Sequence, residues 1–225
     1  MAEIRVKPNA QLPAAAAASL SEWMQAAIDE NGHCYCGLSG GSSPKGLLQA
    51  LSGADLPWEK ITLVMVDERF TTDESQQNQT MLRGFVDSLP QPRPKLLTLL
   101  ADLSLADTLA RANETAAMLP EALDVVVLGM GLDGHTASLF PDSTDYHGAM
   151  HSKSRYVPVV PGQAPFPRIS MSYHWLQNAR HLMLYIPGKD KLDCFRHLMS
   201  DPTVVSPVKT LAAHANNLTV FTSED

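Results

Sequence analysis

The stretch LDVVVLGMGLDGHTASLFP, residues 123–141, decides the fold class of this 225-residue chain. Its first seven residues, LDVVVLG (123–129), are mostly apolar and end at a glycine, which is typical of a strand buried on both faces of a sheet. The residues that follow are rich in glycine and include Asp133 and His135. Parallel sheets bind ligands at the carboxyl ends of their strands, so this stretch predicts a central strand with a site beside it.

Apolar strands alternate with amphipathic helices along the chain. We expect further strands at residues 33–39, 61–66, 96–100, 155–160, 168–172, 181–186 and 218–222, and helices at 13–32, 44–51, 76–88, 103–118 and 189–199. A helix is also expected to begin just after His135. The alternation predicts one α/β domain over residues 1–225, with a mostly parallel sheet and helices on both faces. Residues 142–167 include a proline-rich loop, for which a lid over the site and plain surface both stay open.

The composition excludes several classes of protein and partner. With 44% hydrophobic and 18% charged residues, the chain is not intrinsically disordered. Its formal net charge is −7 and no run of Lys or Arg occurs, so we expect no nucleic-acid partner. No apolar run reaches the ~20 residues that span a bilayer, and the first residues lack the apolar stretch of a signal peptide. We therefore expect no membrane partner and a cytoplasmic location.

The cysteines also favour a reducing compartment. Cys34, Cys36 and Cys194 are an odd number without the spacing of a disulfide framework. Cys34 and Cys36 lie two residues apart on an expected strand, and therefore on one face of it. A pair of metal ligands would fit this spacing, but we favour two buried thiols that pack as small apolar groups.

The first of three polar clusters at expected strand ends is Ser39-Gly40-Gly41-Ser42-Ser43-Pro44. Glycines allow the backbone to approach a ligand closely. Pro44 at a helix start leaves the free amides of the first turn facing outward, which suits an anion. An ordinary capped turn, with Ser42 or Ser43 as the cap, fits the local sequence equally well.

The second cluster, Asp67-Glu68-Arg69, comes directly after the apolar strand that ends at Val66. Three charges at the end of a buried strand favour a functional role over packing. The alternative is a salt-bridged edge in which Arg69 neutralises a carboxylate.

The third cluster contains Asp133 and His135, with Gly134 between them. A histidine beside a glycine can present a free ring nitrogen, and its ordinary pKa of about 6.5 suits a general base near neutral pH. A purely structural histidine is the alternative. The carboxylate two residues away and the other polar strand ends favour catalysis by His135.

Two general motifs overlap these clusters. Gly129, Gly131 and Gly134 fit the G-x-G-x-x-G pattern of dinucleotide sites, but no strand ending in an acidic residue follows about 20 residues later. Residues 37–41 fit the G-x-S-x-G pattern of serine hydrolases with Ser39 as nucleophile, but two glycines and Pro44 delay the helix that should follow the serine. Both interpretations are weaker than that of a histidine general base.

Longer blocks extend over residues 37–191. They are GLSGGSSPKGLLQAL (37–51), VDERF (66–70) with Asn78 downstream, VVVLGMGLDGHTASLFP (125–141), RISMS (168–172) and GKDK (188–191). Together they resemble the signature blocks of 6-phosphogluconolactonases. That family is part of a wider group with a Rossmann-like sheet, which includes glucosamine-6-phosphate deaminases; the deaminases carry a tyrosine where this chain has Arg69. The segment before Asn78 is a residue shorter than the family pattern, and Gln77 stands where serine is expected.

The resemblance implies hydrolysis of 6-phospho-D-glucono-1,5-lactone to 6-phospho-D-gluconate, a step of the oxidative pentose phosphate pathway. His135 would take a proton from the attacking water, and Asp133 or Asp67 would hold its ring. The amides of Gly40 and Gly41, or the guanidinium of Arg69, would stabilise the oxyanion. By resemblance, Arg168 and Lys191 would bind the phosphate, with help from the helix start at Ser42 and Ser43.

No metal or cofactor is expected, because no cluster of residues has the spacing of metal ligands. The partner implied is a small phosphorylated sugar lactone, and the sequence predicts no oligomeric state. Two other functions stay open. One is the isomerase and deaminase chemistry of the related branch, and the other is a sensor that binds a sugar phosphate without turning it over.

Overall fold

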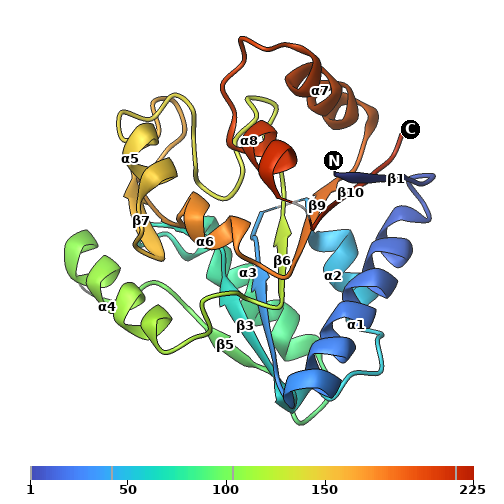
Figure 1. Ribbon diagram of the computed structural model, residues 1–225. Helices are drawn as coiled ribbons and strands as arrows, with labels where there is room; N and C mark the ends of the chain where they lie inside the picture. Colours follow the sequence, from blue (N-terminus) through green and yellow to red (C-terminus); the bar gives the residue numbers. More distant parts are fainter. Residues whose placement is uncertain (1, 42, 103, 216) are drawn as a thin grey trace.

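A parallel sheet runs through the centre of the molecule (Figure 1). The computed structural model describes residues 2–41, 43–102, 104–215 and 217–225. Within these residues, seven parallel strands are arranged in the order β1-β10-β9-β6-β2-β3-β5. Their bounds are β1 Glu3–Val6, β2 Cys34–Leu38, β3 Ile61–Met65, β5 Lys95–Leu97, β6 Val125–Leu128, β9 His181–Ile186 and β10 Leu218–Thr222. The expected central strand is therefore β6, which lies in the middle of the sheet.

Helices cover both faces of this sheet, which confirms the expected α/β architecture. Figure 1 shows α1 and α2 on one side of the strands and α4 and α6 on the other. The helices are α1 Leu12–Asn31, α2 Lys45–Leu51, α3 Asn78–Ser88, α4 Leu105–Ala117, α5 Tyr146–His151, α6 Tyr173–Gln177, α7 Lys189–Ser200 and α8 Pro207–His214, with single 3₁₀ turns η1 Trp58–Lys60 and η2 Glu74–Gln76.

A second, antiparallel sheet lies against the carboxyl end of β3. It consists of β4 (Asp67–Arg69), β8 (Arg168–Met171) and β7 (Tyr156–Val159), in that order. Val66 joins the two sheets, because its N–H donates to Leu38 O at 3.1 Å and its carbonyl accepts from Met171 N at 2.8 Å. The expected strands near 155–160 and 168–172 thus belong to this small sheet, and the charged cluster after Val66 is itself a strand.

The expected helix after His135 is wrong. Thr136 and Leu139 form an isolated bridge instead, and Ala137 between them has a φ of 51°. Residues 142–167, expected as a loop, contain α5 and β7. The expectations also omitted β1, α6 and α8. The first of these is an edge strand with mostly exposed residues, and α6 spans only five residues, so neither shows a clear hydrophobic period.

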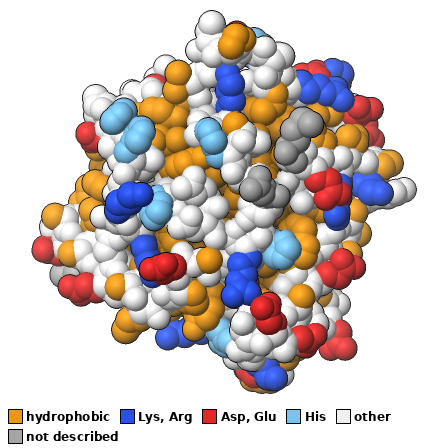
Figure 2. Space-filling view, in the orientation of Figure 1, with side chains coloured by type: hydrophobic (Ala, Val, Ile, Leu, Met, Phe, Trp, Pro, Cys, Tyr) orange, Lys and Arg blue, Asp and Glu red, His pale blue; other side chains and the backbone are white. Residues whose placement is uncertain are grey.

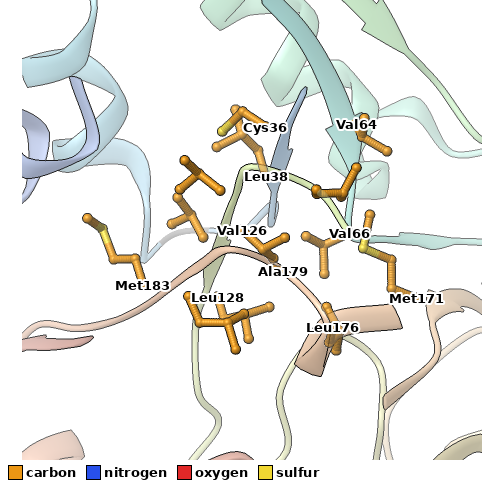
Figure 3. Close-up of a cluster of buried hydrophobic side chains, with 14 of the residues drawn as sticks. Cys36, Leu38, Val64, Val66, Val126, Leu128, Met171, Leu176, Ala179 and Met183 are labelled. Carbon is orange, nitrogen blue, oxygen red and sulfur yellow. The ribbon is translucent and has the colours of Figure 1, made fainter. Parts of the chain in front are cut away.

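The core lies between the sheet and its helices. All residues of β3, β6 and β10 are buried, as their apolar sequences predict. Figure 3 shows part of the core, where side chains of β2, β3 and β6 lie together with Met171 and Leu176. Cys34 and Cys36 are fully buried there, and burial raises the pKa of the Cys34 thiol to about 12. The two thiols therefore pack as apolar groups, as expected.

The surface is mixed in charge. On the face in Figure 2, Lys and Arg side chains are interspersed with Asp and Glu rather than gathered together. Among the helices formed by the described residues, none combines the length and apolarity that crossing a membrane requires.

Candidate active site

A pocket of about 410 Å³ lies where the chain leaves the carboxyl ends of β2, β3, β6 and β9. Its lining unites segments that are up to about 150 positions apart in sequence, because parallel strands end at the same edge of a sheet. The expected site residues in its wall are Gly40, Gly41, Ser43, Asp67, Arg69, His135, Arg168 and Lys191. The predicted convergence of these groups on one cleft is thus what the structure shows.

The loop after β2 forms one wall of the pocket. Gly41 adopts a φ of 88°, a conformation that favours glycine. Gly40 is in close contact with Asn78, because a Cβ on Gly40 would lie 2.3 Å from Asn78 Cγ. Ser43 does not cap α2, since Pro44 occupies the cap position and makes no side-chain cap bond. Ser42, expected to bind phosphate, lies outside the described residues.

Strand β4 places Asp67 and Arg69 in the pocket wall. Asp67 is 7% exposed, and its Oδ2 accepts a 2.6 Å hydrogen bond from the buried Ser138 hydroxyl. The Arg69 guanidinium donates to the carbonyl of Gln76 at 2.8 Å. Among the ion pairs of the described residues, none involves Arg69, so this cluster is not the salt-bridged edge considered above.

The imidazole of His135 is held from two sides. Asp133 Oδ1 lies 2.6 Å from His135 Nδ1, and the Phe140 ring stacks on the imidazole with 4.1 Å between centroids. Burial acts to raise the pKa of Asp133, but the hydrogen bond and charge of His135 outweigh it and hold the pKa below its ordinary value. Of the two carboxylates considered, Asp133 is therefore the one that holds the ring. It lies beside the main pocket, in an adjacent hollow that shares His135.

Two further cations, Arg168 and Lys191, line the same pocket. Arg168 is 6% exposed and faces Arg69 across the β4–β8 pair. Burial lowers the pKa of Arg168 while the charge of Asp67 raises it, and its buried Nε has no hydrogen-bond partner among the described residues. Lys191 at the start of α7 donates to the Ser43 hydroxyl at 2.7 Å, and burial lowers its pKa. A buried guanidinium with an unused donor, in a pocket that a half-buried ammonium also lines, favours an anionic ligand.

The geometry does not support the dinucleotide-site and serine-hydrolase interpretations of the two glycine motifs. Gly131 serves the close approach of the histidine, since a Cβ there would lie 2.3 Å from two His135 ring atoms. No helix of the described residues opens at this loop to bind a pyrophosphate. The buried hydroxyl of Ser39 has no hydrogen-bond partner within the described part of the chain, so it lacks the contact with a base that a serine nucleophile uses.

Comparison with known proteins adds a family to this geometry. The model of the family described as glucosamine-6-phosphate isomerases/6-phosphogluconolactonase matches residues 7–220. The chain belongs to this family. A 6-phosphogluconolactonase of Mesorhizobium japonicum is 33% identical over 189 residues, covering 82% of this chain and 79% of that protein. One of Rhizobium meliloti is 36% identical over 173 residues, covering 75% of this chain and 74% of that protein.

Solved structures agree with the family assignment. The crystal structure of a 6-phosphogluconolactonase from Shewanella baltica matches with a TM-score of 0.93 at 29% identity, over 99% of this chain and 98% of that one. The family resemblance of the sequence blocks and the expected fold are confirmed. Within the described residues, no cluster of three or more His, Cys, Asp or Glu side chains has the arrangement of a metal site.

Sequence reasoning missed several side chains of the site. The Ser138 hydroxyl donates to Asp67, and the Phe140 ring stacks on His135. Phe166 lines the pocket, and its backbone adopts a φ of 68°. The first two lie within the ASLFP block that follows the histidine, so their place in sequence was a usable signal. Phe166 belongs to the segment 142–167, whose last residues line the pocket, and its strained backbone has no signature in the sequence.

Proposed function

We propose that the chain hydrolyses 6-phospho-D-glucono-1,5-lactone to 6-phospho-D-gluconate, with His135 as the general base. One observation carries this proposal: an imidazole held by a carboxylate lies in the same pocket as Arg69, Arg168 and Lys191. A general base beside three cations suits attack by water on a carbonyl group of a phosphorylated substrate. The names of the relatives and the family membership support the same reaction.

Asp133 and His135 form the catalytic pair of this proposal. With the proton of Nδ1 donated to Asp133, the lone pair of the neutral ring is on Nε2. This nitrogen takes a proton from water as the water oxygen attacks C1 of the lactone. The imidazolium, stabilised by Asp133, returns the proton to the ring oxygen as the C1–O bond breaks, which gives a hydroxyl group and a carboxylic acid. The acid then loses its own proton to solvent and becomes the carboxylate of the product. Asp133 therefore orients the base and does not itself react.

Negative charge develops on the lactone carbonyl oxygen during the attack. The amides of Gly40 and Gly41 and the guanidinium of Arg69 line the pocket and are the candidate donors to this oxyanion. Arg168 and Lys191, together with the Ser43 hydroxyl, are the candidate phosphate ligands. Arg168 suits this role because its guanidinium is buried with an unused donor.

A coupled assay tests the proposal. Glucose-6-phosphate dehydrogenase generates the lactone, and its disappearance is followed with and without the protein. Acceleration above the spontaneous rate is expected, and an unchanged rate would contradict the proposal. The same preparation is tested for ammonia release from glucosamine 6-phosphate, the isomerase chemistry. Thermal stabilisation by 6-phosphogluconate without turnover of either substrate would instead identify a sensor.

A further inference from the structure

Glu68 is a buried carboxylate whose role the proposed chemistry leaves open. It lies on β4 between Asp67 and Arg69, yet it is fully buried while its two neighbours line the pocket. An unpaired buried carboxylate is costly, so its hydrogen bonds show its role. Oε1 accepts from the backbone N–H groups of Arg69 at 2.6 Å and Asn78 at 2.7 Å, and Oε2 accepts from that of Gln79 at 2.7 Å.

Two of these three bonds cap the amino end of α3. Gln77 occupies the N-cap position of this 11-residue helix, but its side chain makes no cap bond. Glu68 replaces that cap from a different element, and the backbone N–H groups offset part of the cost of burying its carboxylate. The start of α3 is thereby attached to β4 from within the protein.

Three pocket groups depend on the place of this helix start. Asn78 is the first residue of α3, and its Nδ2 donates to the Asp67 carbonyl at 3.1 Å. The same side chain is in close contact with the Gly40 backbone. The Arg69 guanidinium donates to Gln76 O at 2.8 Å, two residues before α3. Gly40 and Arg69 are both candidate donors to the oxyanion. Their positions therefore depend on where α3 begins.

We propose that Glu68 is a positioning residue, which fixes the start of α3 so that Asn78, Gly40 and Arg69 face the reacting carbonyl. This inference rests on the proposed lactonase function. It assigns Glu68 no contact with the substrate. It predicts a loss in the chemical step rather than in phosphate binding, because Arg168, Lys191 and Ser43 are not attached to α3 by any of these bonds.

Glu68→Gln is the decisive variant. The amide has nearly the same shape, but one of its two ends donates and cannot accept, so at least one backbone N–H faces an NH₂ group. We expect kcat to fall roughly tenfold or more, as misplaced catalytic groups cause, while KM stays close to the wild-type value. Steady-state kinetics at pH 8 measure both constants. The enzyme concentration used for kcat is that of the folded protein, which circular dichroism determines.

Asp124→Asn is the matched control. Asp124 is another buried carboxylate that accepts from a backbone N–H, that of Tyr35 at 2.8 Å, but it precedes β6 at the opposite end of the strand from His135. This variant should keep kcat within about twofold of wild type, because it moves no group of the site. An equal fall in kcat for both variants would show a general effect of buried carboxylates and overturn the inference.

The remaining outcomes are distinct. Wild-type protein without lactonase activity refutes the proposed function, whereas an active wild type with unchanged kcat in Glu68→Gln refutes the positioning role alone.

Asn78→Ala should also lower kcat, and adding Glu68→Gln to it should lower kcat little further, since both act through the same helix start. If the fold-loss in kcat of the double variant equals the product of the two single losses, the two residues act independently, which would contradict this inference. Glu68→Asp, which keeps the charge, should recover part of kcat and carries the test if Glu68→Gln does not fold.

Discussion

His135 and Asp133 make the contact on which the proposed chemistry depends most directly. The side chain of His135 is 27% exposed, which leaves the ring accessible from the pocket while Nδ1 is bound by the carboxylate. The partial exposure distinguishes it from a buried structural histidine. A positioned base of this kind contributes about 10²–10⁴-fold to a hydrolysis.

His135→Ala should therefore lower kcat by about two decades or more without unfolding the protein. The coupled assay measures kcat, and circular dichroism checks the fold. His214→Ala, at the exposed end of α8, is the control for removal of an imidazole elsewhere. Near-normal turnover by His135→Ala would rule out the general base.

Lys191 is the residue through which phosphate binding can be tested. It contacts Ser43 inside the pocket, whereas Lys189 two positions earlier is exposed and pairs with Asp193. Lys191→Ala should raise KM roughly tenfold or more, since a hydrogen bond to a charged group contributes about 1.5–3 kcal/mol. Lys189→Ala should leave KM unchanged. If both variants bind substrate as the wild type does, Lys191 has no place in the phosphate site.

At the scale of elements, the loop after β6 brings the proposed catalytic pair, Asp133 and His135, together. The Gly131 N–H donates to His135 O at 3.0 Å, and Gly134 adopts a φ of 79°. The chain thereby turns back on itself directly after the strand. Because the turn places the imidazole against the backbone of Gly131, only a residue without a Cβ leaves room for the ring.

Gly131→Ala should displace the His135 ring, because the added methyl would lie 2.3 Å from its Nδ1 and Cε1. We expect kcat to fall roughly tenfold or more, with a smaller change in KM and a normal circular dichroism spectrum. Gly148→Ala on α5, where a Cβ meets nothing within 4 Å, is the matched control. Wild-type kcat in Gly131→Ala would mean that the loop tolerates a different ring position.

At the scale of the whole molecule, the pocket gathers positive charge although the chain as a whole is negative. The formal net charge is −7, yet Arg69, Arg168 and Lys191 line one pocket. Local placement of cations, and not total charge, therefore decides which ligand the protein attracts. Glu68 is buried between two residues that line this pocket, and its ionisation affects the free energy of unfolding.

Burial raises the pKa of Glu68 to about 7 from an ordinary 4.5, and Asp67 adds to the rise, although three amide hydrogen bonds act in the opposite direction. The folded protein thus holds this proton more tightly than the unfolded chain does. The contribution of Glu68 to the free energy of unfolding is largest below pH 4.5 and is lost as the pH rises to about 7.

Urea unfolding at a series of pH values tests this linkage. The free energy of unfolding of the wild type, relative to that of Glu68→Gln, should decrease between about pH 4.5 and 7 and then level off. Parallel curves for the two proteins would show that Glu68 has the same pKa in the folded and unfolded states.

Much of the fold follows from local pattern. The strands at 181–186 and 218–222 have the predicted bounds, and β6 lies where LDVVVLG predicts it. These segments are mostly apolar, so their composition and length suffice to predict strands. Short or exposed elements such as β1 and α6 lack such a period. The His135 ring is in close contact with Gly131 and Phe140, and hydrophobic period does not predict such contacts, although both residues are near in sequence.

The sequence by itself determined the parallel α/β class, the polar strand ends and the histidine, because backbone period and residue chemistry are properties of single segments. Only the tertiary structure decided that Asp133, and not Asp67, holds His135 Nδ1, and that Ser138 binds Asp67. It also decided that Glu68 turns inward to cap α3 while its neighbours face the pocket. Asp67 is bound by Ser138 and not by His135 because of distances between segments far apart in the chain, which no local pattern encodes.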